Sequence, residues 1–174
     1  MLENTDTLLS MAEIAAAFAG FAALVSVIRR TDETRHDAVH DLLRLRLVIA
    51  SSVAGVAAAL IPVGIDGYGL DPSLTWRLAA LTFLIFDNGI LASFVSAYRP
   101  VEGTFEPDRL AVGVVMALEV IEQVSLLIVL FGLPVGNAPA LYVTALIANL
   151  CQAGFIFVRF VGSAFQAAQE LPGD

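Results

Sequence analysis

Five long apolar runs constrain this chain more than any other feature of its sequence. Each run is about 20 residues long, the length that an α-helix needs to cross about 30 Å of hydrocarbon. The runs cover residues 8–28, 47–65, 76–98, 110–132 and 140–161. They are continuously apolar and do not alternate with a period of two residues, which excludes a transmembrane β-barrel. With 58% hydrophobic and 15% charged residues, the sequence predicts an all-α integral membrane protein in which residues 1–174 form a single transmembrane domain.

The basic residues predict the orientation of the five spans. The chain has nine arginines and no lysine, and short loops rich in basic residues stay on the cytoplasmic side. If the amino terminus lies outside and the carboxyl terminus inside (N-out, C-in), only Arg77 falls on the outer side. The others then fall on the cytoplasmic side: Arg29, Arg30, Arg35, Arg44, Arg46, Arg99, Arg109 and Arg159. The opposite orientation reverses this bias, so we expect the N-out, C-in topology.

Aromatic and helix-breaking residues predict where individual spans end. Trp76 and Tyr98 lie 22 residues apart, which is about 33 Å of helix, and we expect them to anchor the third span at the two interfaces. The pair Asp71-Pro72 is typical of a helix start, with a capping acid before a proline in the first turn. We expect Pro62 to kink or end the second span and to leave residues 64–69 as an irregular outer loop.

Acidic side chains inside the apolar runs are the feature that bears most on function. There are four of them: Glu13, Asp87, Glu119 and Glu122. No lysine, arginine or histidine lies among them at the same depth. A carboxylate at the centre of a spanning helix costs about 2.5 to 3.5 kcal/mol on insertion scales. These groups therefore require partners, protons or cations.

Depth separates a central group of acids from a peripheral one. When the midpoint of each span is taken as the bilayer centre, polar side chains of three spans fall at one level: Asp87 and Asn88, then Glu119, Glu122 and Gln123, then Asn149 and Gln152. Glu119 and Glu122 are three residues apart, so they share one face of their helix. Glu13 lies about 7 to 8 Å outward of the centre of the first span.

The central acids predict a particular chemistry. Two carboxylates close together in a medium of low dielectric cannot both ionise cheaply, so either one holds a proton at neutral pH or a cation bridges them. Carboxylate and amide oxygens are hard ligands, suited to Ca²⁺, Mg²⁺, Na⁺ or protons. With no cofactor expected other than such a cation, the predicted ion- or proton-binding residues are Asp87, Glu119, Glu122, Asn88, Gln123, Asn149 and Gln152.

Two other interpretations of these polar groups stay open. In the first, they act only as interhelical glue, in which a protonated acid hydrogen-bonds to an amide as part of the structure. In the second, the acids face a water-filled vestibule that binds nothing specifically. Both interpretations place the same side chains inside the bundle but give them no transport activity.

The first span carries small residues at helical spacing, which permit close approach of helices. Two such rows are present: Ala12, Ala16, Gly20 and Ala15, Ala19, Ala23. The face that includes Glu13 could line a pore if several copies assemble around an axis, with Glu13 as an acidic ring at the pore entry. Tight packing within one protomer, with Glu13 near the headgroups, explains the same pattern.

The inner loop at residues 29–41 carries both histidines of the chain. His36 and His40 are four residues apart, so a helical conformation would place them on one face, where they could bind a metal or sense pH. A solvated helix start that leads into the second span explains the same spacing. The loop is too short for a soluble domain, but it is a candidate surface for a cytoplasmic partner.

Missing features disfavour several functional classes. The sequence has no Gly-rich phosphate loop, nucleophile elbow or His-Glu-x-x-His helix, so we do not expect an enzyme. The net charge of −8 and the lack of basic clusters beyond Arg29-Arg30 argue against nucleic-acid binding. The lack of lysine and the bias toward Ala, Val, Leu and Arg are typical of a GC-rich bacterial genome, which predicts a bacterial inner membrane.

These observations together predict a homo-oligomeric channel or transporter for cations or protons that uses the intramembrane carboxylates. Five short helices hardly enclose a water-filled pathway alone, so a pore is more easily built between protomers. The alternative is a membrane scaffold, sensor or regulatory subunit without transport activity, whose buried acids are structural. A small-molecule transporter would need a larger cavity than five helices readily give.

Overall fold

The computed structural model describes residues 4–28, 35–98, 109–135 and 137–169, and of residues 28, 35–41 and 163–169 it describes the backbone alone. The described part contains five α-helices and no strand. They are α1 (Thr5–Ile28), α2 (Arg35–Asp66), α3 (Pro72–Tyr98), α4 (Arg109–Phe131) and α5 (Ala138–Gln169). All five are long and apolar enough to cross a membrane. The prediction of an all-α chain with five such helices is confirmed.

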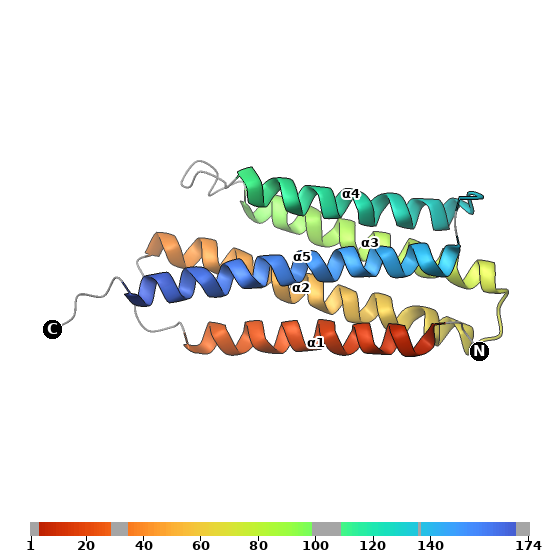
Figure 1. Ribbon diagram of the computed structural model, residues 1–174, viewed down its shortest axis with the longest axis horizontal. Helices are drawn as coiled ribbons and strands as arrows, with labels where there is room; N and C mark the ends of the chain where they lie inside the picture. Colours follow the sequence, from red (N-terminus) through yellow and green to blue (C-terminus); the bar gives the residue numbers. More distant parts are fainter. Residues whose placement is uncertain (1–3, 29–34, 99–108, 136, 170–174) are drawn as a thin grey trace.

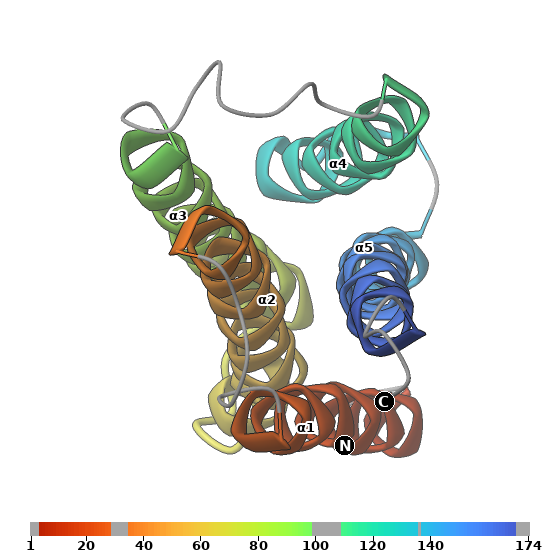
Figure 2. The same ribbon diagram turned by 90° about the vertical axis from the view of Figure 1, so that its left-hand side faces the viewer.

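Successive helices run in opposite directions, so each end of the bundle gathers helix ends from the whole chain (Figure 1). α1, α3 and α5 end where α2 and α4 begin. We call this the arginine end, because the described residues there include Arg44, Arg46, Arg109 and Arg159. The opposite end, which carries Arg77, is the Arg77 end. α5 contacts each of the other helices, whereas the described part of α1 contacts only α2 and α5 (Figure 2).

Two helices extend beyond their apolar runs at the arginine end. α2 begins at Arg35, so the prediction of a loop over residues 29–41 is wrong for residues 35–41. α5 continues beyond residue 161 to Gln169. An apolar run marks the part of a helix that suits hydrocarbon, but a helix with polar residues and no proline continues into water without cost to its hydrogen bonds.

α2 also continues through Pro62 to Asp66, so the prediction of an irregular loop over residues 64–69 is wrong for residues 64–66, while residues 67–69 form a turn outside the helix. A proline has no N–H and therefore leaves the carbonyl four residues earlier without its helical partner. Here that carbonyl belongs to Ala58, and it accepts a 2.7 Å hydrogen bond from the buried hydroxyl of Tyr142 in α5. Because α5 replaces the missing bond, α2 gains another helical turn.

Aromatic side chains pack the half of the bundle toward the Arg77 end. The Tyr142 ring lies 5.3 Å from the Trp76 ring and 6.0 Å from the Phe83 ring, measured between centroids. We call these three residues the aromatic core. Trp76 is only 4% exposed, so its predicted position as an interfacial anchor is wrong. α3 begins at Pro72, earlier than the apolar run, and Trp76 consequently lies in its second turn with its ring against α5.

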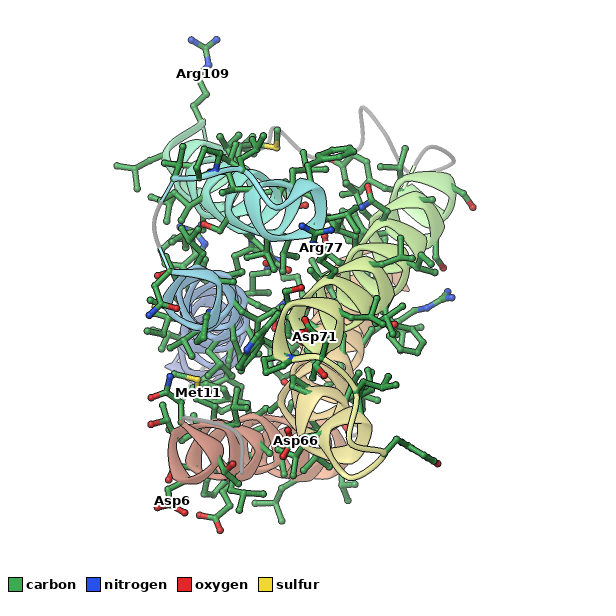
Figure 3. All side chains as sticks on the ribbon, turned by 90° about the vertical axis from the view of Figure 1, so that its right-hand side faces the viewer. Asp6, Met11, Asp66, Asp71, Arg77 and Arg109 are labelled. Atoms are coloured by element: carbon green, nitrogen blue, oxygen red, sulfur yellow. The ribbon has the colours of Figure 1, made fainter. Side chains whose placement is uncertain are left out.

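The end of α4 holds α3 in place at the Arg77 end. Gly132 has a positive φ of 61°, and the N–H groups of Gly132 and Leu133 bond back to Val129 at 3.1 Å and Ile128 at 3.1 Å, as in a Schellman ending. A Cβ atom on Gly132 would overlap the guanidinium of Arg77. Figure 3 looks onto this end and shows Arg77 directed from α3 toward α4, where the helix dipole favours a cation.

The two halves of the bundle differ in packing. The buried side chains of α3 run from Thr75 to Asp87, and those of α4 run from Glu122 to Val129. Between these residues and the arginine end, neither helix has a buried side chain in its described part. Figure 2 looks onto the arginine end, where the near ends of α3 and α4 lie far apart. α3 and α4 are therefore packed toward the Arg77 end and diverge toward the arginine end, where α1, α2 and α5 still bury Ala22, Val48 and Phe160.

Candidate functional site

Three of the four intramembrane acids meet where the packed half of the bundle ends. Asp87 of α3 and Glu119 and Glu122 of α4 place one carboxylate oxygen each within 4.8 Å of one another. Asp87 is the last buried residue of α3, and Glu122 is the first buried residue of α4. We call these three residues the carboxylate cluster. The structure thus brings together the central acids that the sequence placed at one level.

Two glutamines connect the carboxylate cluster to its neighbours. The Gln123 amide donates from Nε2 to Asp87 Oδ2 at 2.6 Å and to Glu119 Oε1 at 3.0 Å. The Gln152 amide of α5 donates from Nε2 to Glu119 Oε2 at 3.1 Å and to the Val115 carbonyl at 3.3 Å. A continuous chain of amides and carboxylates therefore links α3, α4 and α5.

Asn88 lies at the rim of the site and is exposed. Its amide donates from Nδ2 to the Leu84 carbonyl at 2.8 Å and to Gln123 Oε1 at 3.3 Å. Because Asn88 bonds to the amide oxygen of Gln123, the amide nitrogen of Gln123 can donate to the carboxylates of Asp87 and Glu119. Asn88 therefore bonds to the cluster only through Gln123.

Glu122 is the most deeply buried member of the cluster. Its side chain is fully buried, and among the described residues its carboxylate oxygens accept no hydrogen bond of good geometry, although the Asn149 side chain of α5 lies beside them. Asn149 and Ser52 of α2 are also fully buried, and their side-chain polar atoms make no hydrogen bond of good geometry with the described residues either. Each unpaired buried polar group costs about 1 to 3 kcal/mol. A set of such groups in the bundle centre is suited to a ligand that supplies charge or a proton.

A glycine of α2 lets that helix approach the unpaired amide closely. A Cβ atom on Gly55 would lie 3.1 Å from Asn149 Oδ1 and 3.4 Å from Ala15 Cβ. Ser52 precedes Gly55 by three residues, so both lie on one face of α2. Neither Ser52 nor Gly55 is among the site residues that the sequence predicts. The sequence signal that could have identified them is a serine and a glycine three residues apart within an apolar run.

The carboxylate cluster can hold a proton or a hard cation. In the described part of the chain, the carboxylates of Asp87 and Glu119 accept hydrogen bonds from amides. None of the three acids forms an ion pair with a basic side chain of the described residues. Like charges this close in a medium of low dielectric repel strongly, so full ionisation requires a counter-charge. A proton shared between the oxygens or a cation bound by them removes the repulsion. Oxygen ligands alone favour Ca²⁺, Mg²⁺ or Na⁺ over softer metals.

Glu13 lies apart from the other acids. It is exposed on α1, a helix whose described part does not contact α3 or α4. The two predicted small-residue rows of α1 are split between its faces, since Ala12 and Ala15 are buried whereas Ala16 and Gly20 are exposed. The face that carries Glu13 is therefore on the outside of the protomer.

The histidine pair lies in the first turns of α2. His36 and His40 share a helix from Arg35 onward, as the predicted helix start requires, and their side chains lie outside the described residues. The metal-site interpretation of this pair stays a prediction. Residues 29–34, the rest of the predicted partner surface, also lie outside the described residues.

Comparisons with models of protein families, with curated proteins and with solved structures found no match to this chain. The geometry of the carboxylate cluster is consequently the basis for assigning a function.

Proposed function

We propose that this protein moves protons or cations across a membrane through the carboxylate cluster, as a channel or a transporter. The supporting observation is the meeting of Asp87, Glu119 and Glu122 within 4.8 Å in a bundle of helices apolar enough to cross a membrane. Acids at such positions are costly and serve ion pathways and proton relays. Interhelical hydrogen bonding alone explains Glu122 poorly, because the described residues offer this fully buried carboxylate only the Asn149 side chain as a neighbouring amide and no basic side chain.

The route to the cluster runs from the arginine end. On that side α3 and α4 bury no described side chain, so the α3 and α4 wall is the open one, although α2 and α5 bury Val48 and Phe160 there. On the other side Phe83 and Leu126, on α3 and α4, are fully buried. The N-out, C-in topology puts the arginine end in the cytoplasm, and we propose the bacterial inner membrane as the location. An ion would then enter from the cytoplasm, and passage outward would require the aromatic core to move.

We further propose that the protein works as a homo-oligomer. The exposed face of α1, with Glu13, Ala16 and Gly20, offers small residues for helix contact between copies. Because the carboxylate cluster lies within one protomer, each copy carries its own central site. Glu13 then contributes to ion entry only where α1 faces a shared axis. No enzymatic activity is proposed for any of these residues.

Flux measurements in proteoliposomes test the proposal. We expect the purified protein to move protons or one of Na⁺, Mg²⁺ and Ca²⁺ down an imposed gradient. The double variant Glu119→Gln with Glu122→Gln keeps the shape of both side chains but removes two of the three charges. We expect it to abolish the flux while the assembly stays intact, as judged by size-exclusion chromatography.

Glu13→Gln is the matched control, because it neutralises an exposed acid on α1 and leaves the cluster unchanged. Unchanged flux in the double variant would overturn the proposal. If the wild-type protein moves none of these ions and the double variant changes only the melting temperature, the alternative of a scaffold or regulatory subunit is favoured.

A further inference from the structure

A surface groove of about 330 Å³ runs between α2 and α3. Its walls are the α2 segment from Leu43 to Ala50 and the α3 segment from Ile85 to Ala97. None of the acids of the carboxylate cluster lines it. The groove is therefore separate from the proposed ion site, and its chemistry calls for an explanation of its own.

The length of the groove matches one leaflet of a bilayer. The α3 wall covers 12 steps from Ile85 to Ala97, which is about 18 Å of helix, and half of a hydrocarbon core is about 15 Å. The groove starts near the middle of α3 and ends near its last residue, at the arginine end. Apart from Arg46 and Ser93, all of its lining residues are apolar or glycine.

Gly89 gives the groove its depth. A Cβ atom on Gly89 would have nothing within 4 Å, so the glycine opens free space between its neighbours Phe86 and Ile90 in the wall. A groove of about 330 Å³ with such apolar walls suits an extended acyl chain, which is as apolar as the side chains that line it.

A positive charge stands at the arginine end of the groove. The Arg46 guanidinium donates a 3.0 Å hydrogen bond to the Ser93 hydroxyl across the groove. No acidic residue lines the groove, so the groove itself leaves this charge without a counter-ion. Arg46 directly precedes the apolar run of α2 at residues 47–65, so its long side chain can place the guanidinium at headgroup level.

We infer that this groove binds an anionic phospholipid from the leaflet at the arginine end. One acyl chain lies in the apolar groove, and the headgroup phosphate contacts Arg46, with the Ser93 hydroxyl beside it. Guanidinium and phosphate form strong charge-assisted hydrogen bonds. This inference does not depend on the proposed transport of ions.

Native mass spectrometry of the full chain in detergent tests the inference, with phosphatidylglycerol and phosphatidylcholine of identical acyl chains as probes. One basic residue near a membrane surface favours an anionic lipid about five-fold. We expect wild-type protein to bind phosphatidylglycerol about five-fold more tightly than phosphatidylcholine. Arg46→Gln should remove the preference, whereas Arg109→Gln, at an exposed arginine of the same end on α4, should keep it.

Two further variants test the position of the acyl chain. Gly89→Leu fills the groove from α3, and Ala50→Leu fills it from α2. We expect each to weaken the binding of both lipids several-fold, in protein whose helical circular dichroism matches the wild type. Equal binding of the two lipids by the wild type, a preference that survives Arg46→Gln, or full binding in the groove-filling variants would each overturn the inference.

Discussion

The aromatic core and the carboxylate cluster lie side by side in the bundle, yet the hydrogen bonding of their buried polar groups differs. Phe83 of the core and Asp87 of the cluster are one helical turn apart on α3. In the core, the one buried hydroxyl, that of Tyr142, bonds to the Ala58 carbonyl at 2.7 Å. In the cluster, the equally buried Glu122 carboxylate accepts no hydrogen bond of good geometry from the described residues and has only the Asn149 side chain beside it.

This difference separates a stabilising region from a functional one. In the core, the buried Tyr142 hydroxyl repairs the hydrogen bond that Pro62 removes from α2. In the cluster, acids stay buried although amides or apolar residues would fit at lower cost. Sites that lower stability in this way are characteristic of functional positions. The two regions should therefore respond in opposite directions to substitution.

The largest expected effect is a loss of stability in the aromatic core. Phe83→Ala removes a fully buried ring and should lower the free energy of unfolding by about 3 kcal/mol. Equilibrium unfolding in mixed micelles measures this change. Phe21→Ala is the control, since Phe21 is 58% exposed on α1, and it should cost much less. Equal losses for the two variants would mean that the aromatic core does not hold the bundle.

A gain of stability is expected in the carboxylate cluster. Glu122→Met replaces a buried acid that has no basic partner among the described residues with an apolar chain of similar length and should raise the free energy of unfolding by about 2 kcal/mol. The same variant should lose ion flux. Glu13→Met, at an exposed acid, should leave both properties nearly unchanged. A destabilised Glu122→Met protein would favour a structural function for the acid.

The smallest expected effect concerns the hydrogen bond across Pro62. Tyr142→Phe leaves the Ala58 carbonyl unpaired and should lower the free energy of unfolding by about 1 kcal/mol. In a Pro62→Ala background the restored N–H can bond to that carbonyl, so Tyr142→Phe should cost less there. A double-mutant cycle measures the coupling. Additive effects would show that the hydroxyl does not compensate for the proline.

The sequence predicted the parts of this protein that depend on run length and spacing. Five apolar runs are enough to place five helices, and the depth of Asp87, Glu119 and Glu122 is enough to place them at one level. Their partners Gln123 and Gln152 follow from the same depth argument.

The features that the sequence missed depend on how helices rotate and pack against each other. Trp76 looked like an interfacial anchor because its depth was known but the direction of its ring was not. Pro62 predicts a helix end because the hydrogen bond that it removes is replaced by Tyr142, which lies 80 residues later in the chain. The sequence does not place Ser52 in the site, because the close approach of α2 to α5 at Gly55 is a feature of helix packing.

Infrared difference spectroscopy of the reconstituted protein tests the central claim most directly, because it detects protonated carboxyl groups. The difference between cation-free buffer and buffer with the transported cation, or between two pH values for a proton pathway, should contain a carboxyl band. We expect this band to disappear in the Asp87→Asn and Glu122→Gln variants and to persist in Glu13→Gln. A band that is the same in all three variants would show that the carboxylate cluster does not bind the ion and would contradict the account.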